Sequence, residues 1–199
     1  MRLLDLSLPT PEENLAFDEE LLNNLEEGET LRFWESDTWF VAIGKSQRID
    51  QVVCADARVP VGRRASGGGA VLLGPGCLNF ALALSLQQRP ELRDVRGSFA
   101  RILGAIADAL RIDGLELRGQ SDLAIGGRKV SGNAQRRTRN GLLHHGTLLY
   151  NFDAKNVACF LKEPERQPAY RARRRHDEFL GTIPLSKEAM KRRIGNMAL

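Results

Sequence analysis

The chain has 199 residues, of which 42% are hydrophobic and 27% charged, and its formal net charge is +4. Such values are ordinary for a globular domain with a sizeable core. The apolar runs are too short to cross a bilayer, and the three cysteines lack the CxxC spacing of a zinc knuckle. The amino-terminal stretch turns acidic at once and lacks the features of a signal peptide. We therefore expect one cytoplasmic domain over residues 1–199, with no membrane segment.

Positive charge is concentrated in the C-terminal part, in the runs 136–139, 170–175 and 191–193. A basic excess attracts nucleic acid, an acidic protein or phosphate-bearing ligands, or else covers a solvated face. The runs lack the interleaved aromatics suited to stacking on bases, so we expect no nucleic-acid partner. We interpret 163–199 as a basic C-terminal tail and expect no separate C-terminal accessory domain.

The first half of the chain predicts a strand, a helix and then several strands. Thr10 as N-cap, Pro11 at the first helical position and acidic residues in the first turn mark a helix that ends near Gly28. Apolar and β-branched runs indicate strands at 2–8, twice within 29–44, in short pieces within 59–73, and at 77–85.

The second half predicts a helix, a group of strands and a helical end. Apolar residues at helical spacing indicate the helix at 94–110. Because strands cluster in the middle and helices flank them, the predicted fold class is α+β with a mainly antiparallel sheet. The expected elements are strands at 115–118, 122–125, 128–137 and 141–152, a short helix at 154–161, a long basic loop to residue 179, and a last helix at 186–194.

Three consecutive glycines interrupt β-type sequence in the motif RRASGGGAV at 63–71. Glycine weakens a strand, so three glycines within β-type sequence indicate a special structural or functional requirement. One reason is close approach of the backbone to a ligand, with N–H groups directed at an anion and Arg64 supplying forked donors. The other is a glycine-rich bulge or loop. No Gly-Lys-Ser/Thr follows, so this is not a Walker A loop, and the spacing does not fit a dinucleotide fingerprint.

Lys129 lies between glycines in the stretch SDLAIGGRKVSGNAQ at 121–135. In one interpretation Gly126 and Gly127 form a hairpin turn and the lysine extends into solvent. In the other, the small residues that follow leave room for the ammonium to point inward, at an anion brought by a ligand. The strand favours neither interpretation by itself.

A third stretch, LLHHGTLLY at 142–150, interrupts a core strand with two histidines, which are more often satisfied core residues than catalysts. Taken together and in this order, the three motifs resemble the lipoate–protein ligase A family, which is grouped with octanoyltransferases and biotin–protein ligases. The resemblance spans roughly Leu3 to Asp153. It implies an α+β domain in which ATP activates a fatty-acid carboxylate as an acyl-adenylate. The acyl group then moves to a lysine amine of a small acidic carrier.

The resemblance also implies roles for individual residues. Lys129 is similar to a catalytic lysine that contacts the acyl carbonyl and the adenylate phosphate, where an ammonium would stabilise developing negative charge. Lipoate is the implied substrate, and Mg²⁺ is implied at the phosphates with Asp122 as a ligand. The implied ATP- and acyl-adenylate-binding set is Arg64, Ser66, Gly67, Gly68, Gly69, Ala70, Val71, Leu72, Lys129, Ser131, Gly132, Gly146 and Thr147.

Two features depart from the two-domain ligases of that family. The sequence stops at Leu199 without their small C-terminal domain, so either a separate accessory subunit supplies it or the enzyme works without it. Residues 74–76, Gly-Pro-Gly, are instead similar to octanoyltransferases, which act through a cysteine thioester. Cys77 would be the nucleophile, but it begins an apolar strand, which favours a core cysteine. The position before Asp122 that corresponds to the transferase nucleophile holds no cysteine.

We therefore expect an ATP-dependent lipoate–protein ligase that forms an amide with a lysine of an acidic lipoyl domain or a glycine-cleavage H-like carrier. An octanoyl or lipoyl transferase that works from acyl carrier protein, and a non-catalytic relative that binds the carrier, remain as alternatives. The runs from Arg171 to Arg175 and from Lys191 to Arg193 are expected to dock the carrier by charge complementarity. Alternatively, Tyr170 and Arg171 close over nucleotide phosphates, or the runs are solvated surface.

Overall fold

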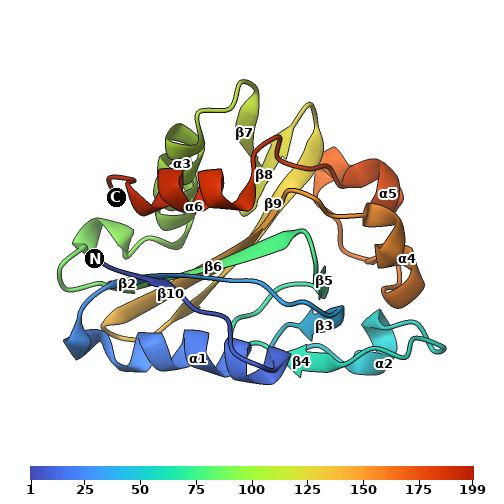
Figure 1. Ribbon diagram of the computed structural model, residues 1–199, viewed down its shortest axis with the longest axis horizontal. Helices are drawn as coiled ribbons and strands as arrows, with labels where there is room; N and C mark the ends of the chain where they lie inside the picture. Colours follow the sequence, from blue (N-terminus) through green and yellow to red (C-terminus); the bar gives the residue numbers. More distant parts are fainter.

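The computed structural model describes residues 1–199 and contains two β-sheets (Figure 1). In the larger sheet only β1 and β2 pair in parallel, and all other neighbouring strands are antiparallel. The predicted α+β class with a mainly antiparallel sheet is therefore confirmed. The order of its seven strands is β1 (Arg2–Asp5), β2 (Thr30–Trp34), β6 (Cys77–Ser85), β10 (Gly141–Leu149), β9 (Arg128–Arg137), β8 (Asp122–Ile125) and β7 (Leu115–Arg118).

The smaller sheet has three strands in the order β4 (Val61–Arg63), β3 (Phe40–Ile43) and β5 (Val71–Leu73). The sequence predicted these strands but not that they form a sheet of their own, apart from β2. Because β3 lies between β4 and β5, the glycine-rich segment 64–70 crosses the end of β3. This crossing places the three glycines at a junction between the two sheets.

Helix α1 (Pro11–Asn23) lies on one face of the larger sheet, whereas α3 (Val95–Leu110) and α6 (Lys187–Gly195) lie on the other (Figure 1). The predicted start of α1 is present as a capping box, in which Thr10 Oγ1 accepts from the Glu13 backbone N–H and the Glu13 carboxylate accepts from the Thr10 backbone N–H. The first helix is thereby fixed at its amino end, close to the loop that follows β1.

The hydrophobic core has separate parts for the two sheets. The larger part fills the space between the seven-stranded sheet and α3 and α6, with Phe80, Ile102 and Met190 among its members. The second part surrounds the smaller sheet and includes Phe40 and Cys77. A small third cluster of Leu22, Ala81 and Leu143 packs α1 against the opposite face of the large sheet.

After β10 the sequence predicted a short helix at 154–161 and then a long basic loop to residue 179. This loop contains short helical elements at Ala169–Arg171 and His176–Phe179, and it turns back onto the β8–β9 hairpin. Leu180 forms a bridge with Lys129, and its carbonyl accepts from Arg128 Nε at 2.8 Å. None of the helices has the length and hydrophobicity to cross a bilayer. The short elements are α2 (Ile49–Val52), α4 (Val157–Phe160), α5 (His176–Phe179), and the 3₁₀ turns η1 (Leu25–Glu27), η2 (Pro90–Leu92), η3 (Ala154–Asn156) and η4 (Ala169–Arg171).

Candidate functional site

The triple-glycine loop is held in place by Arg64, whose side chain is buried beneath it. Its Nη2 donates to the carbonyls of Gly67 and Gly69 at 2.9 and 2.7 Å, and its Nη1 donates to Ala42 at 3.1 Å. Burial lowers the pKa of Arg64 to about 10, so the guanidinium stays charged at neutral pH. The structure thus gives Arg64 a role in shaping the loop, and its predicted contact with a nucleotide stays a prediction.

Close backbone packing supplies one physical reason for the glycines. A Cβ on Gly44, at the end of β3, would lie 2.2 Å from the Gly68 carbonyl oxygen, and Gly68 itself has a φ of +99°. Residues other than glycine rarely adopt a φ in that range. At Gly67 and Gly69, in contrast, an added Cβ would meet nothing within 4 Å. The outer side of the loop is therefore open, which leaves its backbone accessible to a ligand.

Lys129 points inward and does not extend into solvent. Its Nζ lies 2.8 Å from Asp122 Oδ1, and the two side chains are 23% and 9% exposed. A Cβ on Gly132 would lie 2.7 Å from Nζ, so the lysine lies across this glycine. The remaining oxygen of Asp122, Oδ2, accepts from the Tyr170 hydroxyl at 2.8 Å. The predicted hairpin turn at Gly126 and Gly127 is present, with both glycines at positive φ. The lysine of this hairpin nevertheless points inward, and an anionic ligand for its ammonium stays a prediction.

A β-bulge accounts for this orientation. The register between β8 and β9 shifts so that Gly132 pairs with Asp122 but Lys129 pairs with Ala124. Because a bulge inserts an extra residue, it turns a side chain to a different face of the sheet. Lys129 and Gly132 consequently come into contact although they are not an even number of positions apart. The bulge residue Val130 belongs to the core beneath α3.

Strand β10 connects the lysine region with the glycine loop. The Thr147 hydroxyl oxygen lies 3.4 Å from the backbone nitrogen of Gly132. Two positions earlier in β10, His145 Nε2 lies 2.6 Å from Ser66 Oγ. Residues spaced by two along a strand share a face, so His145 and Thr147 project to the same side. The structure therefore brings Ser66, Thr147, Gly132 and Lys129 of the predicted set to one region.

Two predicted residues have their nearest contacts elsewhere. Ser131 is fully buried, and its Oγ accepts from Asn133 Nδ2 at 3.0 Å. A Cβ on Gly146 would lie 1.9 Å from Asn133 Oδ1, so this glycine makes room for the Asn133 amide. Gly146 thus serves the packing of β10 against β9, whereas the Ser131 hydroxyl serves a contact within β9. Their predicted contact with a ligand stays a prediction, as does that of Ala70, Val71 and Leu72, which lead from the loop into β5.

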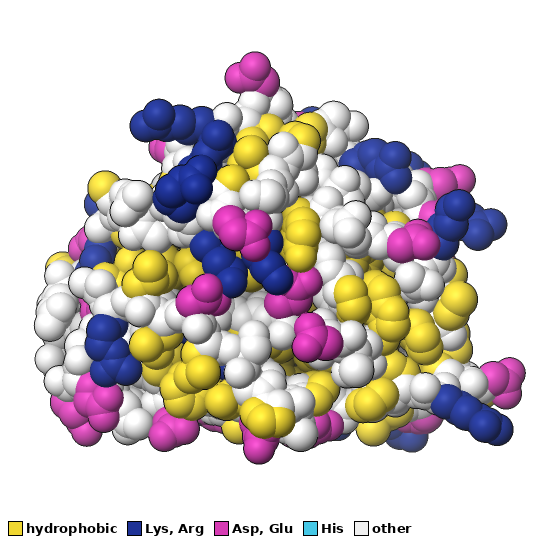
Figure 2. Space-filling model, viewed as in Figure 1, with side chains coloured by type: hydrophobic (Ala, Val, Ile, Leu, Met, Phe, Trp, Pro, Cys, Tyr) yellow, Lys and Arg dark blue, Asp and Glu magenta, His cyan; other side chains and the backbone are white.

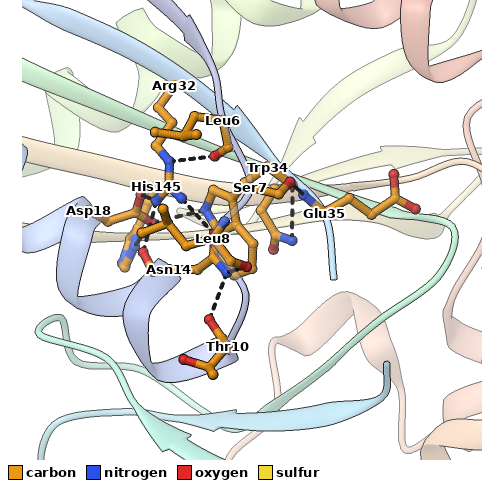
Figure 3. A network of polar contacts seen from close by, with 11 residues as sticks. Leu6, Ser7, Leu8, Thr10, Asn14, Asp18, Arg32, Trp34, Glu35 and His145 are labelled. Carbon is orange, nitrogen blue, oxygen red and sulfur yellow. Dashed lines mark hydrogen bonds and ion pairs between the residues drawn. The ribbon is translucent and has the colours of Figure 1, made fainter. Parts of the chain in front are cut away.

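A buried polar network behind His145 was missed by the sequence reasoning (Figure 3). Arg32, fully buried in β2, donates to Asp18 Oδ1 at 2.7 Å and to Asn14 Oδ1 at 2.6 Å. Asp18 Oδ2 accepts from Trp34 Nε1 at 3.2 Å and lies 3.9 Å from His145 Nδ1. Burial lowers the pKa of Arg32, while Asp18 counteracts that shift.

The signal for this network was available in part. Asn14 and Asp18 are four positions apart and lie on the buried side of α1 together with Leu15 and Leu22. Polar residues on an otherwise buried helical stripe require polar partners, and Arg32 within an apolar strand is such a partner. The network joins α1 to His145, and His145 in turn contacts Ser66 at the glycine loop.

Asp122 does not fit the predicted role of a metal ligand as it stands. One oxygen contacts Lys129 and the other accepts from Tyr170. No group of three or more His, Cys, Asp or Glu side chains lies close enough together to hold a metal ion. A Mg²⁺ ion would therefore depend on nucleotide phosphates for most of its ligands, since Mg²⁺ commonly binds through substrate phosphates and only one or two carboxylates.

Cys77 is a core residue. It is fully buried at the start of β6, and burial is the main cause of a raised pKa of its thiol, with the charge of Glu35 as a second cause. A thiol in this environment stays protonated and is a poor nucleophile. This location disfavours the thioester alternative.

The mainly antiparallel α+β fold is the one that the resemblance implied. Residues 10–183 match the family model "Lipoyl protein ligase A/B catalytic domain". The chain belongs to this family. Lipoate–protein ligase 1 of Staphylococcus aureus is 32% identical over 166 residues, which cover 78% of this chain and 48% of that protein. The chain thus spans about half the length of the curated relatives that it matches.

Solved structures agree with this assignment. A lipoate–protein ligase A bound with ATP is 26% identical and has a TM-score of 0.80, covering 97% of this chain and 81% of its own. A bipartite lipoate protein ligase from Thermoplasma acidophilum, studied with its E2 lipoyl domain, is also 26% identical, with a TM-score of 0.79 and coverage of 97% and 80%. Both similarities extend over nearly the whole chain described here.

Proposed function

We propose that this chain is the catalytic part of a lipoate–protein ligase. It activates lipoate, or octanoate, with ATP and transfers the acyl group to a lysine of a carrier protein. The observation that carries the proposal is the ammonium of Lys129, held by Asp122 across Gly132 and connected through β10 to the glycine loop. The similar ligase bound with ATP supports a nucleotide as the first substrate.

The reaction consists of two substitutions. The lipoate carboxylate attacks the α-phosphorus of ATP, so that an acyl–phosphate bond forms and pyrophosphate leaves. The carrier lysine, as a neutral amine, then attacks the acyl carbonyl, so that an amide forms, AMP leaves and one proton is released. Negative charge develops on the phosphate in the first step and on the carbonyl oxygen in the second.

Lys129 is the group that stabilises this charge. A preorganised cation beside a developing oxyanion acts without reorganising at the moment of reaction, and losing such a donor costs about 3 kcal/mol. The open backbone at Gly67 and Gly69 supplies N–H groups for the nucleotide, and Arg64 keeps the loop in shape. The nucleotide phosphates would hold most of a Mg²⁺ ion's ligand positions, and such an ion would neutralise part of their charge.

The carrier is proposed to be an acidic lipoyl domain or an H-like protein. The similar ligase from Thermoplasma acidophilum was studied with its E2 lipoyl domain, which supports a partner of this kind. A separate accessory subunit is also proposed, because the similar ligase from Thermoplasma acidophilum is bipartite. The need for ATP fits the cytoplasmic location that the sequence leads us to expect.

Exchange of radiolabelled pyrophosphate into ATP, with lipoate and with octanoate, tests the proposed function. Exchange that depends on either acid is the expected result, and the faster acid identifies the preferred substrate. An octanoyl adduct on Cys77 after incubation with octanoyl-acyl carrier protein, detected by intact mass, would instead establish the transferase. A Cys77→Ser variant with full ligase activity is expected.

A further inference from the structure

The C-terminal segment contacts the side chains of the Lys129–Asp122 pair through the Tyr170 hydroxyl. Tyr170, in η4, donates from its hydroxyl to Asp122 Oδ2 at 2.8 Å, and Asp122 Oδ1 lies 2.8 Å from Lys129 Nζ. Burial, followed by the charge of Asp122 and their hydrogen bond, raises the pKa of Tyr170, so the hydroxyl stays protonated and remains a donor. Each oxygen of the Asp122 carboxylate therefore has one partner: Oδ1 contacts Lys129 and Oδ2 accepts from Tyr170.

The position of Tyr170 is itself fixed by the surrounding segment. Its ring packs on Phe179 with the centroids 5.1 Å apart. Its carbonyl accepts from Arg174 Nη2 at 2.9 Å, and the same nitrogen donates to the Gly127 carbonyl at 2.9 Å, in the turn between β8 and β9. The segment that carries the tyrosine is thus attached to the hairpin that carries the lysine.

A lysine ammonium needs such a restraint because its four-carbon stem is flexible and its charge is a compact point. An ammonium has three N–H donors, and the contact with Asp122 uses one of them. The two others stay available for a phosphate or a carbonyl oxygen. Tyr170 holds the Asp122 carboxylate in one orientation, and the carboxylate therefore fixes the position of the Lys129 ammonium. Two N–H donors of the ammonium stay free for the substrate.

We propose that Tyr170 is a positioning residue for the transfer reaction, which acts through Asp122 to hold the ammonium of Lys129 across Gly132. The inference rests on the proposed function, in which Lys129 acts on the acyl-adenylate. It assigns a role in chemistry to the C-terminal segment, whose basic residues had suggested only recognition of a partner or of phosphates.

The fold contains a matched control for this triplet. Tyr150, the only other tyrosine, donates to Glu35 Oε1 at 3.0 Å, and Lys187 Nζ lies 3.0 Å from Glu35 Oε2. The chemistry is the same, a tyrosine, a carboxylate and a lysine in a row. This second triplet connects α6 to the end of β2 and includes no residue of the candidate site.

The test compares Tyr170→Phe with Tyr150→Phe in the full chain. Each variant keeps its aromatic ring and loses one hydroxyl. The assay measures transfer from chemically prepared lipoyl-adenylate to a purified E2 lipoyl domain, with kcat and the KM for the lipoyl domain determined separately. Tyr170→Phe is expected to lower kcat about tenfold, as for one lost hydrogen bond to a charged group, and to leave KM unchanged. Tyr150→Phe is expected to keep the wild-type kcat.

Asp122→Asn and the double variant Tyr170→Phe/Asp122→Asn complete a double-mutant cycle. If Tyr170 acts through Asp122, the double variant is no slower than Asp122→Asn alone, because the two effects are not additive. Multiplied losses would overturn the inference, as would wild-type kcat for Tyr170→Phe. Equal losses in the two tyrosine variants, with lowered melting temperatures, would reduce the role of Tyr170 to folding and also overturn it.

Wild type and Lys129→Ala together distinguish failure of this inference from failure of the proposed function. If wild type itself does not transfer the acyl group, the proposed function is wrong. If wild type is active and Lys129→Ala transfers at the same rate, the role given to Lys129 is wrong, and with it the positioning role of Tyr170. If Lys129→Ala is inactive while Tyr170→Phe is as fast as wild type, only the positioning role is wrong.

Discussion

Gly132 lies directly under the ammonium of Lys129, since a Cβ atom at position 132 would be 2.7 Å from Nζ and equally close to the last carbon of the lysine stem. Real Cβ atoms do not approach other atoms so closely, so one of the two groups would have to move. The group that moves is the flexible end of the lysine, because no backbone atom is that close. The size of residue 132 therefore determines where the cation lies.

Gly132→Ala is expected to reduce transfer from preformed lipoyl-adenylate by about tenfold or more, because the displaced ammonium loses its alignment with the reacting groups. The fold is expected to persist. Gly104→Ala is the control: this glycine lies in α3 with nothing within 4 Å of the added Cβ. Because alanine favours helices over glycine, it should stabilise the protein by about 1 kcal/mol without changing transfer. Normal transfer by Gly132→Ala would show that the position of Lys129 is not critical.

Asp18→Ala is expected to destabilise the protein by about 3–5 kcal/mol, because it leaves the buried charge of Arg32 without its carboxylate partner. Urea unfolding followed by circular dichroism measures this loss. The same variant should weaken binding of a lipoyl-adenylate analogue, since Asp18 supports His145 and His145 contacts Ser66.

The exposed ion pair of Arg48 and Asp50 provides the control for that variant. Asp50→Ala should leave the urea midpoint nearly unchanged, because exposed ion pairs contribute little. If Asp18→Ala behaves like Asp50→Ala, the buried network does not stabilise the fold. Unchanged binding of the adenylate analogue by folded Asp18→Ala would separate the network from the site.

Acid is expected to destabilise the protein through His144. Burial, followed by the charge of His145, lowers the pKa of His144 to about 3. Unfolded histidine has a pKa of about 6.5, so the unfolded state takes up the proton first as the pH falls. The stability is complete above pH 6.5 and is lost progressively below it. Lowering the pH from 7.5 to 5 should cost about 2 kcal/mol through this residue.

His144→Gln isolates that effect, because glutamine does not titrate and can still accept from Gln135, as His144 Nδ1 does at 3.1 Å. Unfolding free energies of the two proteins at pH 7.5 and 5 give the difference directly. Wild type should lose more stability than the variant over this interval. Equal losses would mean that the histidine is not held neutral in the fold.

Docking of the acidic carrier is expected to depend on fewer basic residues than the sequence suggested. Arg171 is buried and pairs with Glu163, and Arg174 donates to the Gly127 carbonyl. Only Arg173 and Arg175 of that run are well exposed. Basic side chains on the face shown in Figure 2 lie in separate groups among acidic ones, so no continuous basic field is available there.

Arg173→Glu/Arg175→Glu should therefore slow carrier modification about tenfold at low ionic strength, because charge complementarity raises the rate of encounter. Formation of lipoyl-adenylate should be unchanged. The defect should shrink as salt is added, since exposed charges are screened beyond about 8 Å at physiological salt. Arg96→Glu, an exposed position of α3 outside both predicted docking runs, is the control. If the double variant slows adenylate formation equally, or if its defect does not change with salt concentration, the carrier does not dock at Arg173 and Arg175.

Local signals in the sequence predicted the elements well and the site only in part. The strands expected at 77–85, 122–125 and 128–137 coincide with β6, β8 and β9 because turn residues flank each segment. The direction of Lys129 depends on a bulge, and spacing along one strand does not reveal a register shift with its neighbour. The sequence analysis did not single out Asp18 or Arg32, because their ion pair forms only when α1 packs on β2.

The most direct test of the central claim is single-turnover transfer from prepared lipoyl-adenylate to a purified lipoyl domain, by wild type and by Lys129→Ala. This assay does not depend on whether a second polypeptide is needed for activation. Losing the cation should slow transfer by about a hundredfold or more, with an unchanged melting temperature, because a preorganised charge at the carbonyl is lost. Transfer by Lys129→Ala at the wild-type rate would contradict the account, because Lys129 would then not act on the adenylate.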